Sequence, residues 1–267
     1  MVRGRPMPDT TTAERAGFSA DSGSRRSERL RLFTEPVVVL AILGAVLVWA
    51  FTGDLDDIEA REINAANILT LTWQHVQITL AVTAIVLLVA IPLGILVTRP
   101  WAKGVAPIVL GIANMGQAAP ALGLLVLFFL LTQQTGFWVA VIPIAFYALL
   151  PVLRNTMVGL QQVDQSLLEA GRGIGMSRFT VLRRIEFPLA VPLMLAGLRT
   201  SLVLAVGSAT LAFFIGGGGL GELIDVGYKL RRTSVLVVGA VLSAALALLV
   251  DWLGGLAEQL LGPKGLR

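Results

Sequence analysis

Apolar residues form six long runs along the chain, separated by short polar segments. The runs cover residues 36–51, 77–97, 105–131, 137–153, 190–215 and 234–253. An α-helix rises about 1.5 Å per residue and needs about 20 residues to cross a hydrocarbon core about 30 Å thick. The period-two alternation of a transmembrane β-strand is missing, and lipid tolerates no spanning structure other than helices and closed barrels. The pattern predicts an all-α, polytopic membrane helical bundle with about six spans.

The third run differs from the others because a polar stretch, Asn114 to Pro120, interrupts it. We interpret it as a broken helix. Amide side chains at membrane depth need a hydrogen-bond partner or a water-filled cavity. Asn114 and Gln117, together with Ser208 and Thr210 near the end of the fifth run, are therefore candidates for the lining of a translocation path. A hydrogen bond between packed helices is the alternative.

The two ends of the first run predict the orientation of the chain. Residues 1–32 are rich in Ser, Thr, Arg and Gly without an apolar period, which predicts a disordered tail. The arginines of this tail predict a cytoplasmic N-terminus by the positive-inside rule, and binding to anionic lipid is a second hypothesis for them. Residues 54–62 are acidic and are expected outside. Residues 222–233 are basic and would also fall outside, so the topology there stays open between a re-entrant loop and a different orientation of the last spans.

Composition agrees with a membrane protein and excludes several kinds of chemistry. The chain is 55% hydrophobic and only 14% charged, against about 25% charged in soluble domains. The formal charge of +4 reports topology in such a chain, so nucleic acid is not expected as a partner. Cysteine is absent, which excludes disulfides and cysteine-ligated metals. The only histidine, His75, cannot build a metal site alone, and we interpret it as an interfacial residue.

Residues 154–188 form a polar island between the fourth and fifth runs. Asp164 is a suitable N-cap for a short helix from Gln165 to Arg172, which Gly173 and Gly175 would end. Ser177 is a suitable cap for a second helix to about Ile185, with Phe179, Leu182 and Ile185 on one apolar face. The following Phe187-Pro188 should end this helix. The sequence therefore predicts two short helices joined by a glycine turn.

The spacing within this island is that of a known signature. It resembles the EAA motif of the membrane subunits of bacterial ABC importers, with Gly171 where alanine is usual. Residues from about 73 to 225 are similar to the osmoprotectant branch of that family, notably Leu150-Pro-Val-Leu-Arg-Asn-Thr156 and Ile215-Gly-Gly-Gly-Gly-Leu-Gly221. The residues that occupy the motif, and that the resemblance assigns to ATPase coupling, are Glu169, Ala170, Gly171, Gly175, Ile185 and Pro188.

The resemblance implies a type I ABC importer transmembrane domain over residues 33–267, with residues 154–188 as its cytoplasmic coupling loop. The implied partners are a cytoplasmic ABC ATPase dimer, a second identical or paralogous permease, an extracytoplasmic solute-binding protein and the lipid bilayer of a bacterial inner (plasma) membrane. No Walker A pattern occurs, so ATP and Mg belong on the ATPase and no cofactor is expected on this chain. The implied solute is glycine betaine, choline or carnitine, with another small polar solute as the alternative.

The resemblance also suggests roles for particular residues. Glu169 would contact the ATPase, Gly171 and Gly175 would allow close approach, and Ile185 with Pro188 would fix the return into the fifth span. A separate glycine run follows that span, where each glycine costs about 1 kcal/mol in a helix relative to alanine. We interpret this run as a flexible outer gate, formed by Gly216, Gly217, Gly218, Gly219 and Gly221.

Two other function classes are alternatives to an importer permease. A secondary transporter coupled to ions needs ionisable residues within its spans, and only Arg199 and Asp251 qualify, both near predicted ends. A membrane-embedded hydrolase needs a nucleophile with a base, yet no Gly-x-Ser-x-Gly elbow occurs and His75 is far in sequence from any suggestive serine. The sequence therefore favours a transport subunit without catalytic residues.

Overall fold

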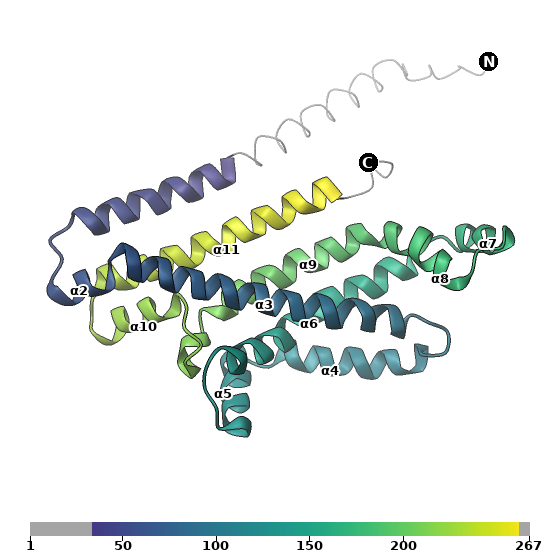
Figure 1. Cartoon of the computed structure of the whole chain (residues 1–267), viewed down its shortest axis with the longest axis horizontal. Helices are drawn as coiled ribbons and strands as arrows, with labels where there is room; N and C mark the ends of the chain where they lie inside the picture. The colour runs from purple at the N-terminus through teal and green to yellow at the C-terminus, as the bar shows by residue number, and fades with distance from the viewer. Residues whose placement is uncertain (1–33, 262–267) are drawn as a thin grey trace, which may run out of the picture.

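The computed structural model describes residues 34–261, and within them every regular element is a helix (Figure 1). The predicted tail, residues 1–32, lies outside the described residues. The first helix is Thr34–Thr52. The other long helices are α3 (Ala65–Val97), α6 (Phe137–Gln161), α9 (Phe187–Ala209) and α11 (Thr233–Leu261). The shorter ones are α2 (Asp57–Glu62), α4 (Ala106–Ala118), α5 (Ala121–Thr132), α7 (Gln165–Gly173), α8 (Arg178–Val181) and α10 (Gly221–Lys229).

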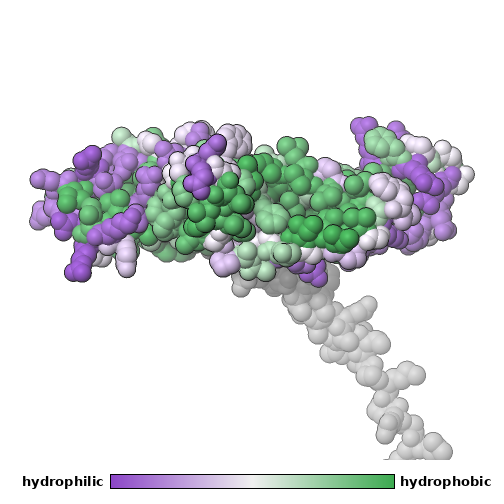
Figure 2. Space-filling view, turned by 90° about the horizontal axis from the view of Figure 1, so that it is seen from below, coloured by the Kyte–Doolittle hydropathy of each residue, from purple (hydrophilic) through white to green (hydrophobic). Residues whose placement is uncertain are grey.

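The long helices run along one axis of the molecule, and the short polar ones lie at its ends. Figure 1 places α2 and α10 at one end and α7 and α8 at the other. Figure 2 shows hydrophilic residues gathered at both ends with hydrophobic residues predominating between them. Among residues 34–261, 5 helices are long and apolar enough to cross a membrane, or up to 6 if the bent pair of α4 and α5 counts as one span. The predicted multi-pass bundle of about six spans is confirmed.

Helix α6 occupies the centre of the bundle and packs against α3, α4, α5 and α9. Small residues set the helix spacing at these contacts. A Cβ added to Gly94 of α3 would lie 2.8 Å from Thr156 Cγ2 of α6, and one added to Gly197 of α9 would lie 2.7 Å from Pro151 O. Since lipid supplies no hydrophobic drive between helices, the van der Waals contacts that such close backbone approach permits contribute to holding them together. The core is therefore built on glycine as well as on Val, Ile and Leu.

Two of the long helices extend well beyond the predicted apolar runs. Helix α3 starts at Ala65 instead of residue 77, because Asn64 caps it by accepting from Asn67 N at 2.8 Å and the polar Gln74 and His75 are satisfied inside the protein. Helix α6 continues to Gln161, although the apolar run ends at residue 153. Hydropathy marks where a helix meets lipid, and protein contacts extend it further.

The predicted broken helix is confirmed. Together, α4 and α5 are long and apolar enough to cross a membrane as one span, but they are bent by 102° at the break between them. Pro120 stands directly before α5 as its N-cap residue. A proline is tolerated there because the first turn of a helix has no internal acceptor for its N–H.

The basic segment after the glycine run lies at the same end of the molecule as the acidic segment, and two of its three cations are paired (Figure 1). Lys229 pairs with Asp225 at 2.7 Å within α10, and Arg232 pairs with Asp56 before α2 at 2.8 Å. Glu59 of α2 also accepts a hydrogen bond from Ser234 at the start of α11. A carboxylate of the acidic segment therefore offsets one of the cations that had contradicted the positive-inside rule, and Asp225 of α10 offsets a second.

Candidate functional site

The polar island folds into two short helices at the α7 end, as predicted. Asp164 caps α7 by accepting from Ser166 N at 2.8 Å, and Ser177 caps α8 by accepting from Thr180 N at 3.2 Å. Between them Gly175 has a φ of +86°, a left-handed conformation that favours glycine, and Met176 N donates to Gly171 O at 3.0 Å. We call residues 164–188 the coupling element.

A small apolar core holds the coupling element together. Val163, Leu168 and Val181 are buried in it, with Met176 and Ile185 packed against them. Gly171 is part of this core, because a Cβ there would lie only 2.8 Å from Ile185 Cδ1. The glycine that replaces the usual alanine therefore makes room for an isoleucine of the same chain. Two positions of the motif, Gly171 and Ile185, are thus brought into contact.

The outer face of the coupling element exposes the remaining motif positions. Glu169, Ala170 and Gly175 are exposed, and no atom lies within 4 Å of a Cβ added at Gly175. Two large apolar side chains stand beside them: Ile174, which the sequence analysis did not select, is 77% exposed, and Phe179, which it expected on a packed face, is 71% exposed. The expectation that Phe179 shares one apolar face with Leu182 and Ile185 is wrong, since only the latter two pack inward. The exposed face also carries the arginines Arg172, Arg178, Arg183 and Arg184.

The second helix does not end before Pro188 but continues into α9, so that prediction is wrong. One π-turn, Leu182–Glu186, joins α8 to α9, and Phe187 N donates to Leu182 O. Proline inside a helix leaves the carbonyl four residues earlier without a donor. A π-turn shifts the hydrogen-bond register just before that point and so accommodates the ring. Pro188 itself is exposed near the start of α9.

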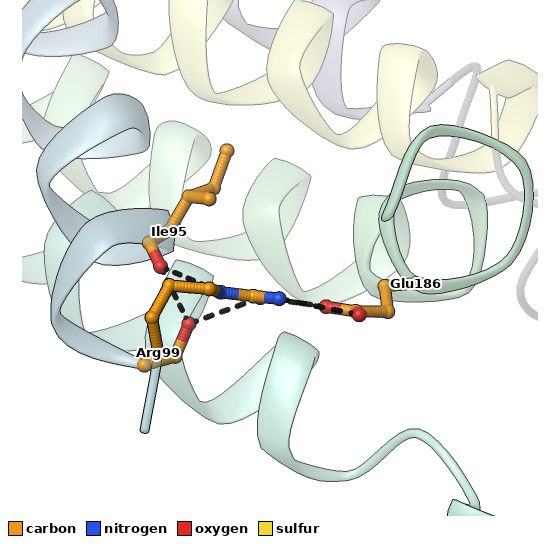
Figure 3. Close-up of polar contacts among 4 residues, drawn as sticks. Ile95, Arg99 and Glu186 are labelled. Carbon is orange, nitrogen blue, oxygen red and sulfur yellow. Dashed lines mark hydrogen bonds and ion pairs between the residues drawn. The ribbon is translucent and has the colours of Figure 1, made fainter. Parts of the chain in front are cut away.

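The last residue of this π-turn, Glu186, forms an ion pair with Arg99 at the end of α3 (Figure 3). Arg99 NH2 lies 2.6 Å from Glu186 Oε2, and NH1 lies 3.2 Å from Oε1. The Glu186 side chain is only 6% exposed, so the carboxylate depends on this partner. Nothing in the sequence motif pointed to Arg99, which is 87 residues away.

The glycine run forms a compact turn at the other end of α9, which we call the glycine turn (residues 216–221). Gly216, Gly218 and Gly219 have φ values of +71°, +79° and +99°. A Cβ at Gly217 would lie 2.9 Å from Ala140 Cβ, and one at Gly221 would fall inside van der Waals contact with Thr210 O. The glycines are therefore required by both the backbone conformation and the close packing.

Two residues of α3 hold the glycine turn. Gln74 Oε1 accepts from Gly219 N at 3.1 Å. His75 is fully buried: Leu220 N donates to its Nδ1 at 3.4 Å, and its Nε2 lies 3.0 Å from Val206 O. Both contacts are satisfied only when the proton is on Nε2, which makes His75 a neutral link between three segments. The interpretation of His75 as an interfacial residue is wrong.

The four candidate path residues are not brought together by hydrogen bonds. Asn114 is exposed and Gln117 half-buried on α4, and neither side chain has a hydrogen-bond partner among residues 34–261. Ser208 is buried in α9 and Thr210 follows that helix as its C-cap. A hydrogen bond between packed helices of this chain, the alternative for the α4 amides, is therefore not observed.

The two ionisable residues noted within the spans neutralise each other. Arg199 of α9 and Asp251 of α11 form a bidentate pair, with Nε–Oδ1 and NH2–Oδ2 distances of 2.7 Å each. Gly254 and Gly255 of α11 lie against the Arg199 side chain. A charge in a span that is already paired to a neighbouring helix needs no ion-coupling role to explain it.

Two carboxyl groups outside the spans have pKa values that are shifted in opposite directions. The Ser166 backbone N–H, donating to Asp164, holds the pKa of that carboxyl below its usual value. Burial, with smaller contributions from Glu62 and Asp225, raises the pKa of Glu222 in α10. Within residues 34–261, no three His, Asp or Glu side chains gather where they could hold a metal ion.

The fold and the coupling element together define a multi-pass transport permease. Residues 90–262 match the family described as binding-protein-dependent transport system inner membrane component. The chain belongs to this family and is the permease component of an ABC importer.

Several curated proteins are similar to this chain over most of their own length. The choline transport system permease protein OpuBB of Bacillus subtilis (strain 168) is 40% identical over 210 residues, 79% of this chain and 95% of the relative. The osmoprotectant import permease protein OsmY of Salmonella typhimurium is 38% identical, over 81% of this chain and 89% of the relative. Among solved structures, the inward-facing MetNI methionine ABC transporter matches with a TM-score of 0.65 at 23% identity, covering 73% of this chain and 96% of that chain, which shows a shared fold.

Proposed function

We propose that the coupling element faces the cytoplasm and docks a separate ATPase of the ABC type. Its exposed side chains support this proposal. Large apolar side chains that stand outside a bilayer mark a protein contact, and aromatic and arginine side chains are enriched in such contacts. Ile174 and Phe179 would enter an apolar cleft of the ATPase, and the surrounding arginines would meet carboxylates at its rim. Glu169 and the open backbone at Gly175 would lie within the same contact.

The role of importer permease also implies a partner within the membrane and one on its outer side. The chain would pair with a second permease, identical or paralogous, and receive its solute from an extracytoplasmic binding protein, with the N-terminus in the cytoplasm. ATP and Mg would be held by the ATPase. Support comes from the family description, which names transport that depends on a binding protein. The exposed Asn114 and the half-buried Gln117 would then face the path, with Ser208 and Thr210 deeper along it, and the glycine turn would serve as the outer gate.

We propose a small quaternary ammonium osmoprotectant as the solute. The names of the relatives support this class, since they specify choline, glycine betaine, carnitine or osmoprotectants. The solute is tested by uptake of radiolabelled glycine betaine and choline into proteoliposomes that contain both permease subunits, with the ATPase and ATP in the lumen and the binding protein outside. Uptake of another small polar solute in place of these would correct it.

Docking is tested by replacing the exposed apolar side chains. Phe179→Ala and Ile174→Ala should reduce co-purification of the ATPase with the permease, because each removes an anchor without opening the core. Tyr228→Ala is the matched control, since Tyr228 is 75% exposed at the opposite end of the molecule. We expect it to retain the ATPase. Full retention by the Phe179 and Ile174 variants would contradict docking at this face.

A further inference from the structure

Arg99 fixes the end of α3 and the start of α9 to each other (Figure 3). Its Nε donates to Ile95 O at 3.1 Å, in the last turn of α3, and its NH2 also donates to Thr98 Oγ1 at 3.2 Å. The remaining donors form the bidentate pair with Glu186. A planar guanidinium held at three points cannot rotate freely. The pair is therefore a directional link between α3 and the π-turn of the coupling element.

The burial of the Glu186 side chain makes the Arg99–Glu186 pair necessary for the local structure. Its side chain is 6% exposed, and Arg99 is the partner that the structure shows for the carboxylate. Around the link, Ile95 of α3 and Leu182 of the π-turn pack against Leu160, Ala190 and Met194. A displacement of the π-turn must therefore either leave the buried Glu186 carboxylate without its partner or move the end of α3 with it.

A second set of polar links joins the same two helices near the glycine turn. His75 of α3 contacts Val206 O of α9 and Leu220 N beyond it, while Gln74 accepts from Gly219 N. These links lie close to the other end of α9. Helix α3 has 33 residues, which corresponds to a length of about 50 Å. Helices α3 and α9 are thus pinned together both at the coupling element and at the glycine turn.

From these two sets of links we infer that α3 and α9 move as one body, and that the Arg99–Glu186 pair transmits displacement of the coupling element to α3 and so to the glycine turn. Arg99 and Glu186 are positioning residues, since neither is placed against the solute or the ATPase. The inference rests on the proposed function, because it assumes that an ATPase moves the coupling element. A discrete link between two packed helices is the kind of contiguous contact through which distant sites are coupled.

The test separates docking from transmission. Arg99→Ala and Glu186→Ala permeases are purified with their ATPase and second permease and reconstituted, and ATP hydrolysis and glycine betaine uptake are measured together. We expect both variants to retain the ATPase, because Ile174 and Phe179 are unchanged. The number of ATP molecules hydrolysed per solute should rise by at least about fivefold, the lower end of the coupling usual between sites. Lys229→Gln, which breaks an exposed pair at the α10 end, is the control and should leave the ratio unchanged.

Conservative variants cover the case in which the alanine variants fail to insert. Glu186→Gln keeps the size of the side chain and one acceptor, and Arg99→Lys keeps the charge but loses the bidentate geometry, so we expect a rise in the same ratio that is smaller than for the alanine variants. Variants that retain the ATPase and hydrolyse ATP at the wild-type ratio would overturn the inference while leaving the proposed function intact. Loss of the ATPase from all four variants would also overturn it, because the pair would then only build the docking surface. A wild-type permease that binds no ATPase would instead contradict the proposed function.

Discussion

The two ends of α9 both depend on glycine, but in opposite ways. At the coupling element, a Cβ added to Gly173 or Gly175 would meet no atom within 4 Å. At the glycine turn, a Cβ added to Gly217 would lie 2.9 Å from Ala140 Cβ, and one at Gly218 would lie 2.9 Å from Gln74 Cδ. The first pair leaves backbone open to a partner, and the second lets segments of the same chain pack closely.

This difference shows that a glycine-rich segment does not have one meaning. An open glycine in a polar element lowers the steric barrier to a second protein, whereas a packed glycine with a positive φ fixes the shape of a turn. In the glycine turn, Gly218 and Gly219 are buried and Gly219 N is hydrogen-bonded to Gln74. A gate built from this turn would therefore move as a fixed unit with α3, and flexibility within it is not needed.

The largest effect is expected from Gly221→Ala. The new methyl group would overlap Thr210 O and lie 2.7 Å from Phe213 Cδ1, and because a backbone oxygen cannot rotate away, the cost should be about 3 kcal/mol, the upper end of the range usual for overpacking. The measurement is the yield of monodisperse permease and its thermal midpoint in detergent. Gly207→Ala, where no atom lies within 4 Å of the added Cβ, is the matched control on α9. Equal yields for the two variants would show that the glycine turn is not tightly packed.

A smaller effect, confined to docking, is expected from Gly175→Val. Valine is β-branched and the φ of +86° is left-handed, so the turn between α7 and α8 should be strained by about 2 kcal/mol. The bundle should remain folded while ATPase co-purification and uptake fall. Gly175→Asn is the sharper control, because asparagine tolerates the left-handed region and should keep much of the docking. Unaltered co-purification by the valine variant would show that the turn geometry does not matter for docking.

The charge balance at the α10 end gives a pH-dependent prediction. Burial raises the folded-state pKa of Glu222 above its ordinary value of 4.5. Such a group favours the folded state when protonated, and this contribution is lost as pH rises from the ordinary value through the folded pKa. Glu222→Gln should therefore raise the free energy of unfolding at pH 7, and with it the thermal midpoint, by less than about 1 kcal/mol, because Glu222 is partly exposed and solvent screens its charge. The gain in stability should vanish near pH 4. An equal gain at pH 4 and pH 7 would contradict a raised pKa for Glu222.

Local signals predicted the elements that depend on local chemistry. The caps at Asp164 and Ser177, the turn at Gly175 after α7 and the interruption before Pro120 are all set by residues within a few positions, and each is confirmed. The apolar runs likewise predicted the number of spans. These features need only short-range hydrogen bonds and the length of a helix in lipid.

Features that depend on distant partners could not be predicted. Pro188 suggested the end of a helix, and only the π-turn together with the Glu186 pair explains why the helix continues. His75 suggested an interfacial residue, because its partners Val206 and Leu220 are more than a hundred residues away. Phe179 has apolar spacing but faces outward. The coupling roles of Glu169 and Gly175 remain predictions, since they concern a surface whose partner is another chain.

The smallest effect is expected from Gly173→Ala, which completes the comparison between open and packed glycines. Gly173 is the last residue of α7, its φ is not in the left-handed region, and an added Cβ would meet no atom within 4 Å. Alanine is the better helix former, so the isolated permease should gain up to about 0.5 kcal/mol at this frayed end. Its thermal midpoint should rise slightly. If ATPase co-purification nevertheless falls, the methyl group must obstruct the partner directly, and Gly173 belongs to the docked surface together with Gly175. If both quantities stay at or above the wild-type level, close approach is confined to Gly175 and Ala170.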